Sequence, residues 1–254
     1  MLVQSVDRAL EILAILSASN GQGHGITEIA ARMGLSKSTV HGLVNTLASR
    51  GYVEQNRETK RYRLGIKLFE LGSLVQRSMD VRLEARPYSQ VLSDRYQATV
   101  HVAVSHDYEV VYIDKLDSPD AIVQYSYVGR RAPLYATGVG KVILANVLLE
   151  EQEAFFQKIP LRSVTANTIT SRQELEKELE HIRKCGYALD NEEIQVGLRC
   201  VAAPIFNHKG YPMAAISVSK HLNTMSSDMQ VQIAQDIVDV ARQISCKFGY
   251  RIEK

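Results

Sequence analysis

A helix-turn-helix pattern followed by a hairpin occupies residues 26–64, which read ITEIAARMGLSKSTVHGLVNTLASRGYVEQNRETKRYRL. Thr27 is a good N-cap for a short helix over residues 28–33. Gly34 ends that helix, because glycine turns left-handed at a helix C-terminus without steric cost. Ser36 then caps a second helix. The segment therefore predicts two helices joined by a tight turn.

The second helix has two different faces. One face is an apolar stripe that is expected to pack on the core, and it is formed by Val40, Leu43, Val44 and Leu47. The other face carries short polar side chains and a glycine that permits close approach, namely Lys37, Ser38, Thr39, His41, Gly42 and Asn45. A helix that enters the major groove of DNA needs such a face near its N-terminus.

Two short strands follow, over residues 52–55 and 60–64, around a turn at residues 56–59. This hairpin is expected to be the wing of a winged helix. Six basic residues accompany two acidic ones between residues 37 and 63, the sign that phosphate contacts need. We predict a DNA-binding domain over residues 1–64, with contacts from Lys37, Ser38, Thr39, His41, Asn45, Arg57, Lys60 and Arg61. The alternative is a winged helix that binds only protein.

Composition bounds the class of protein. The 254 residues suffice for one large domain or two ordinary ones, and 45% of them are hydrophobic. Residues 1–78 carry ten Lys/Arg and six Asp/Glu, whereas residues 79–254 carry twenty and twenty-two. The basic end is thus the one expected to bind DNA. Three widely spaced cysteines without a C-x-x-C motif argue against a disulfide framework or a structural zinc site.

The sequence predicts a soluble, cytoplasmic protein that makes no membrane contact. Asp7, Arg8 and Glu11 interrupt any apolar segment of a signal peptide near the N-terminus. The chain has no run of about 20 apolar residues that could span a bilayer. The isolated cysteines fit a reducing compartment.

Further helices are expected on both sides of the winged-helix motif. Ser5 is predicted to cap a first helix with a broad apolar surface, formed by Val6, Ala9, Leu10, Ile12, Leu13, Ile15 and Leu16. After the wing, residues 65–79 predict a linker helix. This helix either only connects the domains or also pairs with its copy in a dimer that reads two half-sites.

Residues 80–254 predict an α+β domain around a mostly antiparallel sheet. Residues 100–104 alternate with period two, which is typical of a half-buried strand. The expected strands are 100–104, 110–113, 121–127, 198–206 and 211–219, and the expected helices are 81–97, 142–149, 171–184, ending at Gly186, and a last one containing Ile233 to Ile244.

A first candidate ligand site lies at the start of the helix over residues 142–149. Thr137 is its predicted N-cap, and Gly138 and Gly140 are expected to leave backbone amides open to an anion. Alternatively, the glycines only ease a tight entry into the helix. The spacing does not match a Walker A loop, so nucleotide hydrolysis is not expected.

Two further polar patches are candidates for the same site. The first is DNEE at residues 190–193, followed closely by GLRC at residues 197–200. The second is Ser217 and Ser219, which share a strand face because they are two residues apart. Together with the helix start they would suit a small hydroxylated acid. Amides and hydroxyls would hold its carboxylate, and Asp190 would accept hydrogen bonds from its hydroxyls.

An ordered set of motifs spans most of the chain. It comprises SKSTV (36–40), Leu47, GYV (51–53), YRLG (62–65), YATGVGK (135–141) and GLRCVAAPIF (197–206). In these motifs the chain resembles the IclR family of bacterial transcription regulators. The resemblance implies a winged helix, a linker helix and an effector-binding domain of GAF-like fold. We also expect a homodimer or a dimer of dimers on a palindromic DNA operator, because winged-helix proteins commonly read two half-sites with two-fold symmetry.

The resemblance further implies a small-molecule pocket, and no cofactor is expected. Its effector-binding positions fall on Gly138, Val139, Asp190, Cys200, Ser217 and Ser219. Val139 stands where the family often has alanine, which narrows the expected pocket. The stretches GRRAPLY (129–135) and DNEE (190–193) resemble the subgroup that regulates degradation of 2-keto-3-deoxygluconate and related sugar acids. The leading hypothesis is therefore a homo-oligomeric repressor controlled by a small carboxylate.

Two alternatives belong to other functional classes. The first is a hydrolase with Cys200 as the nucleophile and either His101 or His221 as the base. It requires the sulfur and an imidazole nitrogen to lie within hydrogen-bond reach. The second is a metal sensor with Asp190, Glu192 and histidines as ligands, although those spacings match no standard site.

Overall fold

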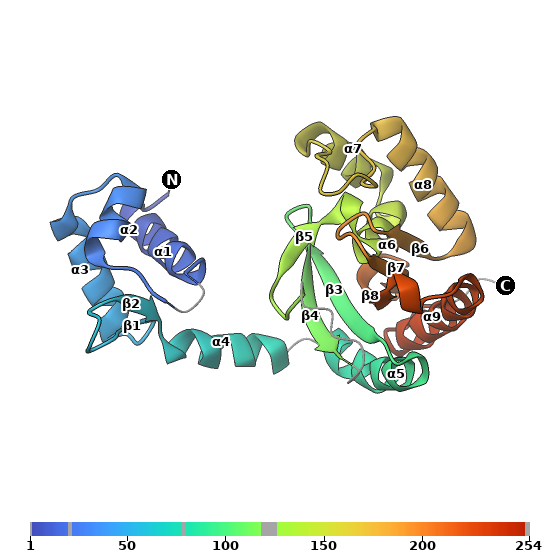
Figure 1. Ribbon diagram of the computed structural model, residues 1–254, viewed down its shortest axis with the longest axis horizontal. Coiled ribbons are helices and arrows are strands. Elements are labelled where there is room, and N and C mark those ends of the chain that lie inside the picture. The colour runs from blue at the N-terminus through green and yellow to red at the C-terminus, as the bar shows by residue number, and fades with distance from the viewer. Residues whose placement is uncertain (1, 20–21, 78–79, 118–125, 252–254) are drawn as a thin grey trace. The chain divides into compact units, whose positions relative to one another are not determined.

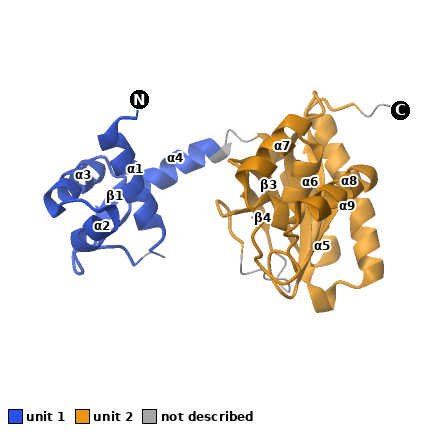
Figure 2. Cartoon of the chain, turned by 90° about the horizontal axis from the view of Figure 1, so that it is seen from above, with its two compact units in different colours: residues 1–78 blue, residues 79–254 orange. Residues whose placement is uncertain are grey.

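The computed structural model describes residues 2–19, 22–77, 80–117 and 126–251. The chain divides into two compact units, residues 1–78 and 79–254, which Figure 2 shows in different colours. Within the described ranges, no helix is both long and apolar enough to cross a membrane.

The first unit is a winged helix-turn-helix followed by one more helix (Figure 1). Its elements are α1 (Gln4–Ser17), α2 (Ile26–Met33), α3 (Lys37–Ser49), β1 (Val53–Gln55), β2 (Tyr62–Leu64) and α4 (Ile66–Arg77). The strands β1 and β2 pair antiparallel as the predicted wing. Its core contains the side chains of Ile12, Leu16, Ile29, Ala30, Val40, Val44, Val53 and Tyr62.

The helix-turn-helix follows the sequence prediction closely. Gly34 has a φ of 63° and ends α2 in the left-handed conformation. The Ser36 hydroxyl accepts the Thr39 N–H at 3.2 Å and so caps α3. Val40 and Val44 are fully buried, while Leu43 and Leu47 pack against the same core. These predictions are confirmed.

Two predicted helix starts in this unit are wrong. Helix α2 begins at Ile26, with Gly25 as the N-cap, so Thr27 lies inside the first turn. The Glu28 carboxylate accepts the Gly25 N–H at 3.3 Å and replaces the expected threonine cap. Helix α1 begins at Gln4 without a side-chain cap, and Ser5 is already helical.

The predicted apolar surface of α1 is buried only in part. Ile12 and Leu16 are buried, whereas Val6 and Leu10 are 55% and 60% exposed. The buried residues of α1 thus lie in its C-terminal half. The N-terminal half therefore presents apolar side chains to the outside of this unit.

In its described residues, the second unit is a six-stranded antiparallel sheet with helices on both faces. Its strands are β3 (Thr99–His106), β4 (Glu109–Leu116), β5 (Arg131–Pro133), β6 (Ala188–Asn191), β7 (Leu198–Phe206) and β8 (Pro212–His221). The strand order is β5-β4-β3-β8-β7-β6, and every neighbouring pair is antiparallel. The predicted α+β class with an antiparallel sheet is confirmed.

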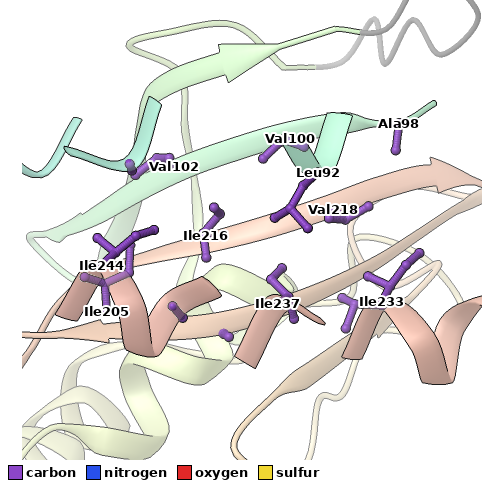
Figure 3. Packing of buried hydrophobic residues seen from close by; sticks show 14 of the residues in the cluster. Leu92, Ala98, Val100, Val102, Ile205, Ile216, Val218, Ile233, Ile237 and Ile244 are labelled. Carbon is purple, nitrogen blue, oxygen red and sulfur yellow. The ribbon is translucent and has the colours of Figure 1, made fainter. Parts of the chain in front are cut away.

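The helices cover the two faces of this sheet. They are α5 (Asp80–Tyr96), α6 (Gly138–Asn146), α7 (Leu149–Lys158), α8 (Arg172–Cys185) and α9 (Ser227–Lys247), with the 3-10 turns η1 (Leu134–Ala136) and η2 (Leu222–Thr224). Helices α5 and α9 contribute to the core in Figure 3, where Leu92, Ile233 and Ile237 lie close to the strand residues Val218 and Ile216. Helices α6, α7 and α8 form the second core, on the opposite face.

Several element predictions for this unit need correction. Strand β8 runs to His221, and β5 was not predicted, because three residues show no period. Helix α6 starts directly after Thr137, four residues before the predicted start. Most of the strand predicted at 121–127 lies outside the described residues. The helix from Ser171 to Gly186 is confirmed at both caps.

Candidate functional site

The polar face of α3 is exposed in the first unit. The side chains of Lys37, Ser38, Thr39, His41 and Asn45 are all on the surface, as a DNA interface requires. Some of these side chains are already engaged in hydrogen bonds within the helix. The Ser36 hydroxyl lies 2.9 Å from both the Ser38 and the Thr39 hydroxyls, which turns these groups toward the start of the helix. Asn45 Nδ2 lies 3.2 Å from His41 Nδ1, one helical turn away.

The wing carries its basic residues in two different settings. Arg57 and Lys60 are exposed at the tip, where the Asn56 side chain accepts the backbone N–H groups of Glu58 and Thr59. Arg61 instead binds back to its own unit. Its guanidinium lies 2.8 Å from a Glu28 carboxylate oxygen and donates to the Gly23 carbonyl at 3.1 Å. Arg61 therefore fastens the wing, and a contact with DNA stays a prediction.

A row of polar side chains crosses one face of the large sheet. The register places Asp190 on β6 opposite Cys200 on β7, and Cys200 opposite Ser219 on β8. Ser217 lies two residues along the same strand face, opposite His101 on β3. Each of these five side chains is at most 4% exposed. Four predicted effector residues are thus brought together, with His101 beside them.

The start of α6 lies against this row. A Cβ atom at Gly138 would lie 3.3 Å from the Ala202 Cβ and 3.7 Å from the Asp190 Cβ. Gly138 therefore lies beside the polar row, and Val139, the next residue of α6, is buried in the apolar core on this face of the sheet. Their contact with an effector stays a prediction. The predicted cap is also present, because the Thr137 hydroxyl accepts the Gly140 N–H at 3.1 Å.

Gly140 does not have the role that the sequence suggested. Its N–H is taken by Thr137 and so is not open to an anion. A Cβ atom there would lie 2.2 Å from the Leu134 carbonyl oxygen, a distance no side chain tolerates. Gly140 serves the tight entry into α6, which was the alternative reading of this glycine.

A buried ion pair lies beside the row, and sequence reasoning missed it. Lys141 is 1% exposed, and its Nζ lies 2.5 Å from Glu193 Oε1 and 3.1 Å from Glu178 Oε1. The other Glu193 oxygen is buried and has no hydrogen-bond partner among the described atoms. The available signal was a lysine at the start of an otherwise apolar helix, because a buried lysine needs a carboxylate.

Asp190 sits in an environment that opposes its negative charge. Burial, and then the nearby charge of Glu193, raise its pKa to about 7, although it accepts the Glu193 N–H at 2.8 Å. Near neutral pH the side chain is therefore partly protonated. A protonated Asp190 donates a hydrogen bond as well as accepting one, whereas the sequence suggested only an acceptor.

Cys200 and His101 are joined through a serine, but not as a nucleophile and its base. The Ser219 hydroxyl lies 3.1 Å from Cys200 Sγ and 3.4 Å from His101 Nδ1. Burial raises the pKa of the Cys200 thiol well above its usual value and lowers that of His101 to about 3. A reactive cysteine needs a lowered thiol pKa and a base next to its sulfur.

The cysteines and the possible metal ligands bear on the other predicted classes of site. All three cysteines are free. Within the described residues, no group of three or more histidine, cysteine, aspartate or glutamate side chains is arranged to hold a metal. The polar row is a set of buried hydrogen-bonding groups, and groups of this kind can orient a small polar ligand.

A winged helix-turn-helix and a sheet domain with such a site, in one chain, are typical of a ligand-responsive transcription regulator. Family comparison agrees. Residues 5–57 match the IclR helix-turn-helix domain, and residues 74–246 match the C-terminal domain of the bacterial transcriptional regulator IclR. The chain belongs to the IclR family and is a DNA-binding transcription regulator, not an enzyme.

Individual relatives match along nearly the whole chain. The HTH-type transcriptional regulator XynR of Escherichia coli K12 is 38% identical over 249 residues, 98% of each chain. The regulator KdgR of Dickeya chrysanthemi is 37% identical, covering 97% of this chain and 81% of that protein. The crystal structure of Thermotoga maritima IclR superimposes with a TM-score of 0.80 at 36% identity, covering 97% of this chain and 99% of that one.

Proposed function

We propose that the protein represses a sugar-acid catabolic operon and that a small carboxylate effector controls its DNA binding. The observation that carries this proposal is the buried polar row at the start of α6, formed by Asp190, Cys200, Ser217 and Ser219. Similarity to KdgR and XynR, and the motifs shared with the 2-keto-3-deoxygluconate subgroup, support a sugar acid as the ligand. The protein would act in the cytoplasm, where its operator lies.

The effector is expected to bind with its carboxylate toward the serines and the amides of Gly138 and Val139. Hydroxyl groups donate well to a carboxylate, and a helix N-terminus favours negative charge. The sugar hydroxyls would then face Asp190, which both donates and accepts near neutral pH. Cys200 would fill the space between these groups as a small, weakly polar side chain.

Residues 1–64 would bind DNA, residues 65–79 would connect the domains, and residues 80–254 would bind the effector. We also propose that two copies pair on a palindromic operator, and that two such dimers assemble into a dimer of dimers. Support comes from large apolar side chains left exposed on α1 and α4, namely Val6, Leu10, Ile66, Phe69 and Leu74. Exposed apolar surface of this kind marks protein interfaces. An effector must then bind one spacing of the paired DNA-binding domains better than another.

The test is binding of the full chain to labelled DNA from beside its own gene, with and without 2-keto-3-deoxygluconate and a panel of related acids. We expect tight, salt-dependent binding that one acid weakens. Asn45→Ala should weaken operator binding without changing acid binding, and Ser217→Ala should do the reverse. DNA binding that no acid changes would refute the sugar-acid effector. Binding only at the non-specific level would refute local control of the neighbouring operon.

A further inference from the structure

His101 lies at the centre of a hydrogen-bonded chain that ends in the proposed effector site. It is buried on β3, and its Nε2 lies 2.7 Å from the Ser126 hydroxyl, which is also buried. On the other side its Nδ1 lies 3.4 Å from the Ser219 hydroxyl, which in turn lies 3.1 Å from Cys200 Sγ. None of the family motifs in the sequence includes His101.

The donors and acceptors along this series of hydrogen bonds define the direction in which each bond is donated. The Ser219 hydroxyl has one proton and donates it to Cys200 Sγ, since a thiol is a poor donor. His101 Nδ1 must then carry a proton and donate it to the Ser219 oxygen. His101 Nε2 is left as the acceptor and receives the Ser126 hydroxyl proton. The imidazole is neutral, because burial lowers its pKa to about 3.

We propose that His101 is a positioning residue that fixes Ser219 as a hydrogen-bond donor into the effector site, so that the site selects an anionic oxygen. The inference rests on the proposed function and identifies the ligand group that Ser219 binds. Because His101 occupies a lone pair of Ser219, the serine proton has to point away from β3. Among the described residues, the acceptor that the Ser219 proton meets is Cys200 Sγ, which is a weak one.

An arriving carboxylate offers a much better acceptor than a thiol. Hydrogen bonds to an ionised group are shorter and roughly twice as strong as neutral ones. The Ser219 proton turns from Cys200 to the carboxylate, and only a weak bond to sulfur is lost. With the opposite direction of the chain, Ser219 would instead present a lone pair and would favour a ligand with a donor, such as an amine.

Calorimetric titration of the full chain with 2-keto-3-deoxygluconate tests the role of His101. His101→Leu removes the donor to Ser219 and should lower the affinity roughly tenfold or more. His101→Asn keeps an N–H near the Nδ1 position and should stay within about threefold of the wild type. Ser93→Ala is the matched control, because it loses a buried hydrogen bond to the Ala98 carbonyl outside the polar row.

Equal losses in His101→Leu and His101→Asn, or a comparable loss in Ser93→Ala, would mean that His101 only supports the fold, and would overturn the proposal. Selective loss in His101→Leu, with rescue by asparagine, would support it.

Nitrogen NMR of ¹⁵N-histidine-labelled protein tests the direction of the chain without any effector. The signals of His101, one of seven histidines, are assigned by their absence in His101→Asn. We expect the neutral form with the proton on Nδ1 from pH 5 to 8. A proton on Nε2 would overturn the inference. If the wild type binds no acid and the proton is on Nδ1, the effector class is wrong, but the assignment of Ser219 as a donor is supported.

Discussion

The exposed face of α3 and the buried row of the sheet both depend on polar side chains, but at different cost to the fold. On α3 the side chains of His41 and Asn45 contact each other and solvent, while the core lies on the opposite side of the helix. Around the row, Asp190 of β6 and Lys141 of helix α6 are 1% exposed, and burial of such groups requires hydrogen-bonding or charged partners. Substitutions on α3 should therefore change DNA binding alone, whereas those in the row should also change stability.

The largest effect is expected at the Lys141–Glu193 pair. Lys141→Met removes the cation and leaves Glu193 buried without its charge partner, which typically costs about 3–5 kcal/mol of unfolding free energy. Urea unfolding followed by circular dichroism measures the loss. Lys184→Met is the control, because its pair with Glu180 lies on the surface, and no measurable change is expected there.

The double variant Lys141→Met/Glu193→Gln separates loss of the pair from loss of packing. It removes both charges, so it should recover a large part of the stability lost in Lys141→Met. A double variant as unstable as the single one would show that the lysine matters through its packing and not through the ion pair.

The next largest effect is a pH dependence at Asp190. Its folded-state pKa of about 7 exceeds the ordinary 3.8, so the folded state binds more protons than the unfolded state between these values. Wild-type stability should therefore fall as the pH rises from about 4 to 7 and level off above. Asp190→Asn lacks this loss, and its amide oxygen still accepts the Glu193 N–H.

Measured against the wild type, Asp190→Asn should gain about 2–4 kcal/mol between pH 4 and pH 8. Unfolding experiments at these two pH values determine the gain. A difference that does not change with pH would mean that Asp190 is ionised throughout. The buried row would then carry more charge than we infer.

On α3 the expected effect is on DNA discrimination. Asn45→Ala should reduce the preference for operator over mismatched DNA by about 1–3 kcal/mol, because an asparagine amide can pair with an adenine edge in the major groove. Its unfolding free energy should stay within about 0.5 kcal/mol of the wild type. Equal weakening on both DNAs would mean that Asn45 positions the helix and does not read a base.

The same difference explains what the sequence could predict. Exposed functional residues leave the apolar period intact, so the stripe on α3, its Ser36 cap and the Gly34 stop could all be predicted. In the sheet, the alternation predicted the strands, and the shared motifs placed Asp190, Cys200 and Ser219 in one site. The register that puts Cys200 opposite both other residues follows only from the fold.

Sequence reasoning missed the side-chain contacts that join residues far apart in the sequence. Lys141 and Glu193 are 52 positions apart, and His101 reaches Ser219 across 118 positions. No local pattern indicates such pairs. The wrong start of α2 has a different, local cause, since Thr27 is a good cap in isolation but the Glu28 carboxylate accepts the Gly25 N–H instead.

The smallest effects are expected in the wing, which has both an exposed basic residue, Arg57, and one bound within the fold, Arg61. Arg57→Ala should weaken binding to all DNA sequences and reduce the salt slope by about 1, without changing stability. Arg61→Ala should instead lower stability by about 1 kcal/mol, because it loses the bond to the Gly23 carbonyl and the contact with Glu28. DNA binding at several salt concentrations and urea unfolding of both variants show which residue contacts DNA and which stabilises the fold. If Arg61→Ala instead lowers the salt slope and leaves stability unchanged, Arg61 contacts a phosphate in the DNA complex. Its contact with Glu28 of α2 is then broken when DNA binds.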